Sequence, residues 1–369
     1  MYKVFGFVNL HHSPSLGPLT ETRSLASTSF LGRYAFIDFT LSNFTNSGVE
    51  EVGILVKNNM RSLIKHMGSG MSWNINTKLG SRVIMYNEAM ANNPLYNNDV
   101  SNIAANDWML MVSKADYIVV APVHFIMSID YRKVIDEHIS SGAEISVVYH
   151  NMTSAKKMED CDVVDVSSGC IKSIHKNECD KDCVNLSLET YVINRKRFRK
   201  LIQEAKEYSA IYSLRDIINY VAKSEPVHAY EHTGYVRVID SLSSFQKVSL
   251  ELLSHRVWNQ LFHADWPIYT VTHDTMPARY LESSQVRNAY IANGSIVNGT
   301  VENSIISRNV VIGKGAVVKN SIILTDTLIG EGVVLDGVIV DKYAKIIHSK
   351  KLVAKDKDQP IFIRQGDVI

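Results

Sequence analysis

Apolar runs alternate with amphipathic stretches through the first 150 residues. Val52–Val56 and Tyr117–Ala121 are almost wholly apolar, as strands buried on both faces of a parallel sheet are. The segment between them repeats apolar side chains at helical spacing, at Met60, Leu63, Ile64 and Met67. This alternation predicts βαβ units and a doubly wound, mostly parallel sheet.

The same spacing predicts three helices that matter below. One is expected from Arg33 to Ser47, ended by a glycine in the left-handed conformation. A second is expected to begin at Asp99 as its N-cap and to carry Ile103, Leu110 and Met111. A third is expected from Ser243 to Leu261.

The pattern changes near the C-terminus. The tetrapeptide Asn303–Ile306 recurs 17 residues later as Asn320–Ile323, and aliphatic residues recur every six positions within each unit. Hexad-spaced aliphatics indicate a parallel β-helix, in which each hexad forms one side of a triangular coil. Three hexads make 18 residues, so each coil loses one residue at a corner. Ordinary antiparallel strands would not keep this phase over three units.

These changes predict three segments. Residues 1–245 form an α/β domain, residues 246–285 a helix and linker, and residues 286–369 the β-helix. The linker is marked by Trp266-Pro267-Ile268 and by Met276-Pro277, since proline interrupts regular structure.

Composition narrows the class of protein. The chain has 369 residues, which favours two domains, and 46% hydrophobic with 21% charged residues is ordinary for a globular protein. The net charge of +1 gives no reason to expect a nucleic-acid or membrane surface. The apolar start, Met1–Leu10, is interpreted as a first strand and not a signal peptide. Together with four cysteines expected as free thiols, this predicts a cytoplasmic protein.

We expect no metal site in this chain. Cys179 and Cys183 could share a helix face, but His175 is the only nearby further ligand, and zinc requires four. His12 and His124 could in principle bind a softer metal; satisfied or solvent-facing histidines are the simpler interpretation.

The segment after the first strand occupies the place where α/β nucleotide-binding domains hold phosphates. A phosphate loop needs glycines for close backbone approach and cations for charge. Here the chain has no glycine until Gly17 and no lysine or arginine until Arg23. The position therefore suits a nucleotide, and the chemistry is absent.

Several motifs resemble those of ADP-glucose pyrophosphorylases. They are Leu16–Thr20, Gly32-Arg33-Tyr34, Ile37–Asn43, Asn46–Gly48, Trp266–Ile268 and Ile339–Lys342. The likeness runs the length of the chain and is closest to GlgD-type subunits, which are regarded as regulatory or non-catalytic. It implies a Rossmann-like nucleotidyltransferase domain with a mostly parallel mixed sheet, followed by a C-terminal left-handed parallel β-helix.

The resemblance also implies where catalytic groups should stand. Active members join glucose 1-phosphate to ATP with Mg²⁺ and release pyrophosphate. The expected positions are degenerate: Ser15 replaces an arginine, Leu25 a lysine, and His124 and Val238 the two metal-binding aspartates. The four positions would converge on one pocket, so no catalytic residue is expected. Two further motifs are also altered, at Asn98–Ser101 and His175–Asn177.

The resemblance therefore implies a catalytically inactive, regulatory subunit in bacterial glycogen biosynthesis. Its partner would be a catalytic homologue that carries the Mg²⁺, in a hetero-oligomer expected to be a tetramer, with self-association also open. No cofactor is expected in this chain. Arg33, Lys342 and Arg364 are candidates for binding a sugar-phosphate or nucleotide effector, against the alternative of solvated cations.

Three other functions stay open at this point. The chain could be a weakly active glucose-1-phosphate adenylyltransferase, or a structural partner without any ligand site. A hexapeptide acyltransferase would need a histidine between neighbouring coils as a general base, and His348 is the only histidine in the repeats, at their end.

Overall fold

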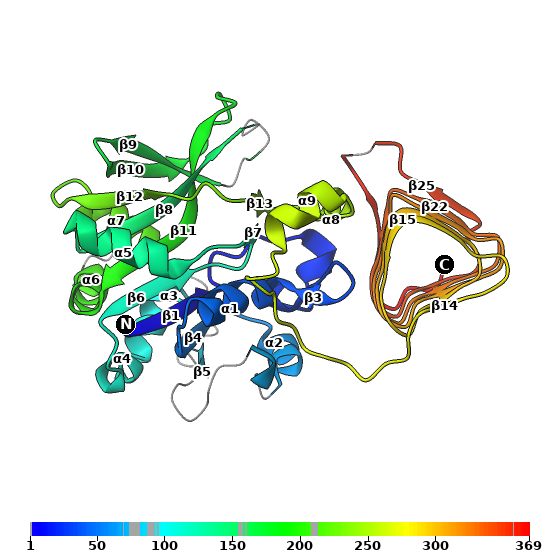
Figure 1. Ribbon diagram of the computed structural model, residues 1–369, viewed down its shortest axis with the longest axis horizontal. Coiled ribbons are helices and arrows are strands. Elements are labelled where there is room, and N and C mark those ends of the chain that lie inside the picture. Colours follow the sequence, from blue (N-terminus) through cyan, green and yellow to red (C-terminus); the bar gives the residue numbers. More distant parts are fainter. Residues whose placement is uncertain are drawn as a thin grey trace. The chain divides into compact units, whose positions relative to one another are not determined.

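The structure is a computed structural model, and it describes residues 2–68, 70–73, 82–86, 93, 96–153, 158, 161–207, 213–356 and 358–369 (Figure 1). Contacts divide the chain into two compact units made of interleaved segments. The first unit comprises Met1–Ser13, Ile37–Val236 and Asp265–Tyr269; the second comprises Pro14–Phe36, Arg237–Ala264 and Thr270–Ile369. The domain boundaries at residues 245 and 285 stay a prediction.

The first unit is built on a mixed sheet. Within the described residues its strand order is β5 (Arg82–Tyr86), β4 (Glu51–Val56), β1 (Val4–Asn9), β6 (Tyr117–Ala121), β11 (Val184–Asn194), β8 (Ile145–Met152), β12 (Val227–Glu231), β10 (Cys170–Lys176) and β9 (Asp162–Ser167). Strand β1 runs parallel to both β4 and β6, whereas β11 runs antiparallel to β6 and β8. The βαβ arrangement expected from the apolar runs is therefore confirmed.

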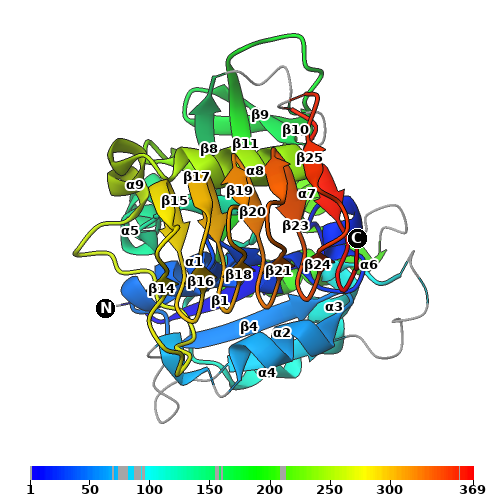
Figure 2. The ribbon, with the colours of Figure 1, turned by 90° about the vertical axis from the view of Figure 1, so that its right-hand side faces the viewer.

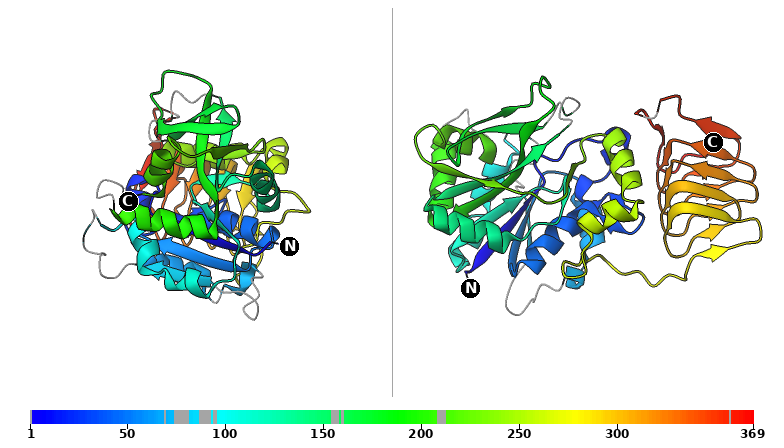
Figure 3. Two further views of the ribbon diagram at one scale, coloured as in Figure 1. Left: turned by 90° about the vertical axis from the view of Figure 1, so that its left-hand side faces the viewer. Right: turned by 45° about the horizontal axis from the view of Figure 1, so that its top comes forward.

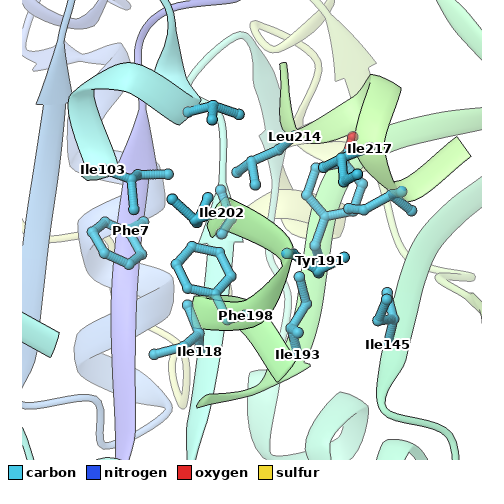
Figure 4. Packing of buried hydrophobic residues seen from close by; sticks show 14 of the residues in the cluster. Phe7, Ile103, Ile118, Ile145, Tyr191, Ile193, Phe198, Ile202, Leu214 and Ile217 are labelled. Atoms are coloured by element: carbon cyan, nitrogen blue, oxygen red, sulfur yellow. The ribbon is translucent and has the colours of Figure 1, made fainter. Parts of the chain in front are cut away.

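Helices cover this sheet and close its main core. Helices α3 (Asp99–Ala105), α6 (Arg195–Glu207) and α7 (Leu214–Val221) contribute apolar side chains to one cluster with the central strands. Figure 4 shows Phe7, Ile118 and Phe198 packed together in it, and the rings of Phe7 and Phe198 stack with centroids 5.6 Å apart. Further elements of this region include α2 (Met60–Met67), α5 (Tyr131–Ser141) and β7 (Phe125–Met127).

The helix expected to start at Arg33 starts later. Helix α1 spans Phe36–Asn46, and the residues before it form a short hairpin of β2 (Ser29–Phe30) and β3 (Tyr34–Ala35). Leu31 and Gly32 have φ values of 51° and 70°, which a right-handed helix cannot accommodate. Arg33 is consequently a turn residue and not a helical one.

The other two helix predictions were wrong in detail. Asn98, not Asp99, caps α3, because its side chain accepts a hydrogen bond from the Ser101 amide at 2.8 Å. That helix ends at Ala105, and a separate helix, α4 (Trp108–Val112), leaves Met111 63% exposed.

The long helix is likewise divided, into α8 (Leu242–Glu251) and α9 (His255–Leu261). The break occurs because the amides of Leu253 and Ser254 bond to carbonyls three residues back, and Ser254 is extended, with ψ of 120°. Strand β13 (Val236–Val238) precedes these helices.

The second unit contains a left-handed parallel β-helix, as expected. Its strands are β14 (Arg279–Tyr280), β15 (Gln285–Ile291), β16 (Ile296–Val297), β17 (Thr300–Ile306), β18 (Val311–Ile312), β19 (Val317–Lys319), β20 (Ile322–Ile323), β21 (Leu328–Ile329), β22 (Val334–Asp336), β23 (Val338–Val340), β24 (Lys345–Ile346), β25 (Lys351–Val353) and β26 (Ile361–Ile363). Val301, Val318 and Leu335 pair in one register, as the 17-residue repeat predicts. Figure 1 looks along the coils, whose outline is triangular.

Asparagines form one corner of this triangle. Asn288, Asn303 and Asn320 have φ values of 46–47°, in the left-handed region that asparagine tolerates better than most residues. Their side-chain amides form a ladder, each Nδ2 donating to the Oδ1 of the next coil at 2.9 and 2.7 Å, and the last donating to Asp336 at 2.8 Å. The ladder gives the corner residue a hydrogen bond that holds adjacent coils in register.

None of the helices in the described parts of the chain is long and apolar enough to span a membrane.

Candidate functional site

The side chains of the loop after β1 form hydrogen bonds within the first unit. Asn9 ends the strand, and its Oδ1 accepts a hydrogen bond from the His11 amide at 3.1 Å. The His11 ring is buried, with Nε2 3.0 Å from the Asn102 amide group on α3. The segment where a phosphate loop would stand is therefore fastened to the sheet and to α3.

Asp99 is the centre of this arrangement. Its side chain is fully buried, and Oδ2 accepts from Asn9 Nδ2 at 2.9 Å and lies 3.3 Å from His12 Nε2. Oδ1 accepts from the amide of Leu214, the first residue of α7, at 3.3 Å. One carboxylate thus connects β1, the following loop and two helices.

Electrostatics make the His12–Asp99 contact an ion pair at neutral pH. Burial opposes the charge on His12, but the hydrogen bond and negative charge of Asp99, with Glu189 further away, raise its pKa to about 9. Burial would likewise raise the pKa of Asp99, and the hydrogen bond and charge of His12 lower it instead. Each partner stabilises the charged form of the other.

His124 makes a second pair in the same unit. It is 5% exposed, and its Nε2 lies 3.6 Å from Glu189 Oε1. Glu189 has a φ of 46° and sits where the register between β11 and β8 shifts, between Ser187 and Thr190. Burial opposes the charge of Glu189, but His124 and His12 hold its pKa below the usual range. The register shift thereby places the Glu189 carboxylate beside His124, the residue that the sequence predicts in place of a metal-binding aspartate.

Several groups of this unit that could hold phosphates are engaged within the chain. The first amides of α3 are satisfied internally: Val100 N–H donates to Asp99 at 2.8 Å, and Ser101 N–H to Asn98. Arg215 and Lys176 both pair with the buried Asp162, at 3.1 and 3.3 Å. Lys176 belongs to the altered motif His175–Asn177, and its ammonium group pairs with a carboxylate of this chain.

The side chains present do not fit Mg²⁺. Magnesium needs an octahedral set of oxygens, usually with one or two available carboxylates. Asp99 and Glu189 each face a histidine, and histidine nitrogen suits softer metals. Across the described ranges no cluster of three or more His, Cys, Asp or Glu side chains is placed to hold a metal ion.

The other predicted positions belong to the second unit. Leu25 and Val238 are 3% and 5% exposed and pack as apolar core residues. Ser15 is exposed, and its hydroxyl accepts from the Gly17 amide at 3.3 Å. None of these three side chains carries a charge. Their convergence with His124 on one pocket stays a prediction.

The second unit has a pocket of about 270 Å³ that contains Arg33. Its lining also includes the basic side chains Arg308 and His273, the ring of Tyr290, and the polar Thr272 and Asn293. No described lining residue is acidic. This composition favours a small anionic ligand.

The hairpin and the β-helix together build this pocket. Leu31 and Gly32 turn the chain so that Arg33 faces solvent, and Gly32 lies so close to the Ile306 carbonyl that a Cβ would approach to 3.1 Å. Arg308 Nη2 donates to the Arg33 carbonyl at 3.5 Å. Tyr290 stacks on Trp258 of α9, with ring centroids 5.7 Å apart. The hairpin and the bond from Arg308 to the Arg33 carbonyl thus place both arginines in the lining of the pocket.

Lys342 and Arg364 are not among the pocket-lining residues. Arg364 Nη1 lies 3.4 Å from the exposed Glu21, and the Lys342 amide donates to Asp341 at 2.7 Å. Next to them lies a buried pair that the sequence did not reveal: Arg23 donates to both Asp341 oxygens, at 2.7 and 2.9 Å. Arg23 therefore ties the segment before Arg33 to the last coils.

A proton-linked effect on stability follows from His11. Burial lowers its pKa to about 4, against an ordinary value of about 6.5. Below pH 6.5, His11 binds a proton in the unfolded chain but not in the folded chain, so the free energy of unfolding falls as the pH drops from 6.5 toward 4. We expect His11 to account for about 2 kcal/mol of lost stability between pH 7.5 and 5.

Urea unfolding of the wild type and of His11→Gln at both pH values measures this contribution. The variant should lose about 2 kcal/mol less than the wild type over that interval. Equal losses in the two proteins would show that His11 is not held neutral in the folded state.

The mixed sheet of the first unit and the β-helix of the second unit together define a class of protein: a nucleotidyltransferase domain joined to a hexapeptide-type β-helix. Residues 15–173 match the nucleotidyl transferase family. Residues 275–365 match the GlmU-like, C-terminal hexapeptide family.

Three relatives show more closely which proteins the chain is similar to. The chain is 36% identical over 280 residues to the glycogen biosynthesis protein GlgD of Geobacillus stearothermophilus, covering 74% of this chain and 71% of the relative. It is 30% identical over 279 residues to GlgD of Bacillus subtilis, covering 74% and 70%. It is 32% identical over 280 residues to glucose-1-phosphate adenylyltransferase of Fervidobacterium nodosum, covering 74% and 67%. The chain belongs to the family of GlgD proteins and glucose-1-phosphate adenylyltransferases.

Proposed function

We propose that this chain is a regulatory, catalytically inactive subunit of ADP-glucose pyrophosphorylase in bacterial glycogen biosynthesis. It modulates a catalytic homologue that makes ADP-glucose and pyrophosphate from ATP and glucose 1-phosphate. The two form a hetero-oligomer, expected to be a tetramer, and Mg²⁺ acts in the catalytic subunit only.

The observation that carries this proposal is the pairing of His12 with Asp99 and of His124 with Glu189. Phosphoryl and nucleotidyl transfer depend on cations and metal ions that neutralise charge developing on phosphates. Here the carboxylates that could hold a metal each pair with a histidine. The cation Lys176 pairs with Asp162, and Arg215 pairs with both Asp162 and Asp216. The charges are arranged to stabilise the fold and not a reacting nucleotide.

The pocket at Arg33 supplies the regulatory half of the proposal. The pocket is lined by basic side chains, by the ring of Tyr290 and by polar groups, and its lining residues belong to the second unit. Binding of a phosphorylated metabolite there would engage Arg33 and Arg308 directly. Lys342 and Arg364 stay weaker candidates, since neither lines this pocket.

The proposal is tested by mixing the purified chain with its catalytic homologue. Addition of this chain should raise turnover or change the response to sugar phosphates and inorganic phosphate. With Arg33→Ala in the complex, the concentration giving half-maximal effect should rise about tenfold, because a charge-assisted contact of about 1.4 kcal/mol is lost. Arg256→Ala, which removes another exposed arginine of the second unit, serves as the matched control.

Three outcomes would contradict parts of this proposal. Effector curves that are identical for wild type, Arg33→Ala and Arg256→Ala would remove the effector site and leave a structural partner. A catalytic subunit whose turnover and effector response ignore this chain would remove the regulatory role. Synthesis of ADP-glucose by this chain alone would favour the alternative, a weakly active glucose-1-phosphate adenylyltransferase.

A further inference from the structure

Three of the four cysteines lie near one end of the hairpin formed by β9 and β10. Cys161 directly precedes β9, and Cys179 and Cys183 lie in the connection from β10 to β11. Cys170 is the first residue of β10, at the other end of the hairpin. All four are in the thiol form. Figure 2 and the left panel of Figure 3 show this hairpin, in green, at the top of the view.

Asn177 stands opposite Cys161. The register of the hairpin pairs Lys176 with Asp162. The Asn177 amide donates to the Cys161 carbonyl at 2.9 Å, which extends this register by one residue. Residues directly opposite each other in an antiparallel pair place their side chains on the same face. Asn177 and Cys161 are each 7% exposed, so their side chains are neighbours on a buried face.

The Asn177 side chain connects the segment before Cys161 to Cys179. Its Nδ2 donates to the Met158 carbonyl at 2.9 Å, and its Oδ1 accepts from the Cys179 amide at 3.2 Å. Cys179 has a φ of 58°, in the left-handed region, so the chain turns at this residue. One buried amide group therefore holds together the two segments that carry Cys161 and Cys179.

The Cys179 thiol points back toward the hairpin. Its Sγ donates to the Asn177 carbonyl oxygen at 3.8 Å. A residue in an antiparallel pair directs its N–H and its C=O toward the same neighbouring strand. Because the Asn177 N–H is bonded to Cys161, the Asn177 carbonyl faces that side as well. The Cys179 thiol consequently lies on the side of Cys161.

The two thiols differ in exposure. Cys161 is buried, whereas Cys179 is partly exposed. In thiol–disulfide exchange an accessible thiolate makes the first attack, and a second thiol close to it then displaces the group that has been bound. Exposure assigns the first role to Cys179 and the second role to Cys161.

We propose that Cys161 and Cys179 form a thiol–disulfide exchange site that reacts with low-molecular-weight disulfides. The Cys179 thiolate attacks one sulfur of the small disulfide, so that a bond to Cys179 forms, the original S–S bond breaks and one small thiolate leaves. The Cys161 thiolate then attacks the Cys179 sulfur, forms the Cys161–Cys179 bond and releases the second small thiolate. The protons of the two cysteines pass to the two leaving thiolates. The cysteines are oxidised by two electrons, and the small disulfide is reduced to two thiols.

The new bond would fasten the end of the hairpin that carries Asp162 and Lys176, whose side chains pair at 3.3 Å. Closing a loop of about 20 residues removes chain entropy from the unfolded state and should lower the unfolding equilibrium constant about a hundredfold. A small thiol reverses the exchange, so the stability of the chain should follow the ratio of small disulfide to small thiol. This inference does not rest on the regulatory function proposed above.

Incubation of the folded full chain with oxidised glutathione, followed by alkylation, proteolysis and mass spectrometry, tests the proposal. The wild type should yield peptides joined through Cys161 and Cys179, and dithiothreitol should separate them. In Cys161→Ala the mixed disulfide between glutathione and Cys179 should accumulate at least about tenfold above its level in the wild type, because no second thiol displaces glutathione. In Cys179→Ser the buried Cys161 should stay unmodified.

Cys170→Ser and Cys183→Ser are the matched controls. Each removes one of the other two cysteines, and both variants should form the Cys161–Cys179 bond at the rate of the wild type. Three results would overturn the proposal: a bond between Cys179 and Cys183 as the main product, a mixed disulfide at Cys179 that persists in the wild type, or a wild type that keeps all four cysteines as thiols.

Urea unfolding of the oxidised and the reduced wild type is a second measurement that needs no variant. The oxidised form should have an unfolding equilibrium constant about a hundredfold lower than that of the reduced form. Equal constants would show that the folded chain does not place the two thiols for bonding. Neither result bears on whether the chain regulates a catalytic homologue, so the two proposals fail separately.

Discussion

His12→Ala should lower the free energy of unfolding by about 3 kcal/mol at pH 7, because it leaves the buried charge of Asp99 without its cation. The loss should depend on pH in a defined way. The folded pKa of His12 lies at about 9, above its ordinary value, so its contribution is fully present below pH 6.5 and disappears as the pH rises through 9. In urea unfolding, the difference in the free energy of unfolding between the wild type and His12→Ala should therefore be large at pH 7 and much smaller at pH 9.5.

His175→Ala is the matched control. Its Nε2 also lies near a carboxylate, at 3.4 Å from Asp165, but the side chains are 44% and 63% exposed, so the change should stay within about 0.5 kcal/mol. In His12→Ala/Asp99→Asn, part of the loss should be recovered, since no buried charge is left. Equal costs for His12→Ala and His175→Ala would mean that the His12–Asp99 pair does not hold the loop.

Much of the fold follows from periodicity. The apolar runs locate β4 and β6, and the 17-residue repeat locates the coils, because both patterns report side chains that are buried in a regular lattice. Element ends were less predictable. The start of α1 depends on the positive φ of Leu31, a residue type that rarely adopts it, and the break after Glu251 has no glycine or proline to signal it.

Only part of the candidate site could be predicted from the sequence. A family motif identifies positions where charge is missing, such as Leu25 and Val238, because an absent charge can be read directly from the residue type. What replaces that charge depends on tertiary contacts. Asp99 resembles a helix cap, and Glu189 reaches His124 only through a register shift in β11. Arg23 and Asp341 are 318 residues apart, and no local pattern connects them.

Purified alone, this chain should form ADP-glucose at least about a thousandfold more slowly than a catalytic homologue. Each preorganised group that stabilises transition-state charge is worth about 10²–10³ in rate, and the sequence predicts that metal carboxylates and phosphate cations are both missing here. His124 is paired with Glu189, and Val238 is an apolar core residue, so neither can be recruited without rebuilding the site. Manganese in place of magnesium should not restore activity, since no described cluster holds a metal.

The most direct measurement is ADP-glucose synthesis from ATP and glucose 1-phosphate by the homogeneous chain, with Mg²⁺, with Mn²⁺ and with EDTA, beside the catalytic homologue alone and the mixture of both. We expect background rates for this chain with either metal, and a mixture whose turnover or effector response differs from that of the homologue alone. Mg²⁺-dependent synthesis by this chain alone, abolished by EDTA and comparable to that of the homologue, would contradict it.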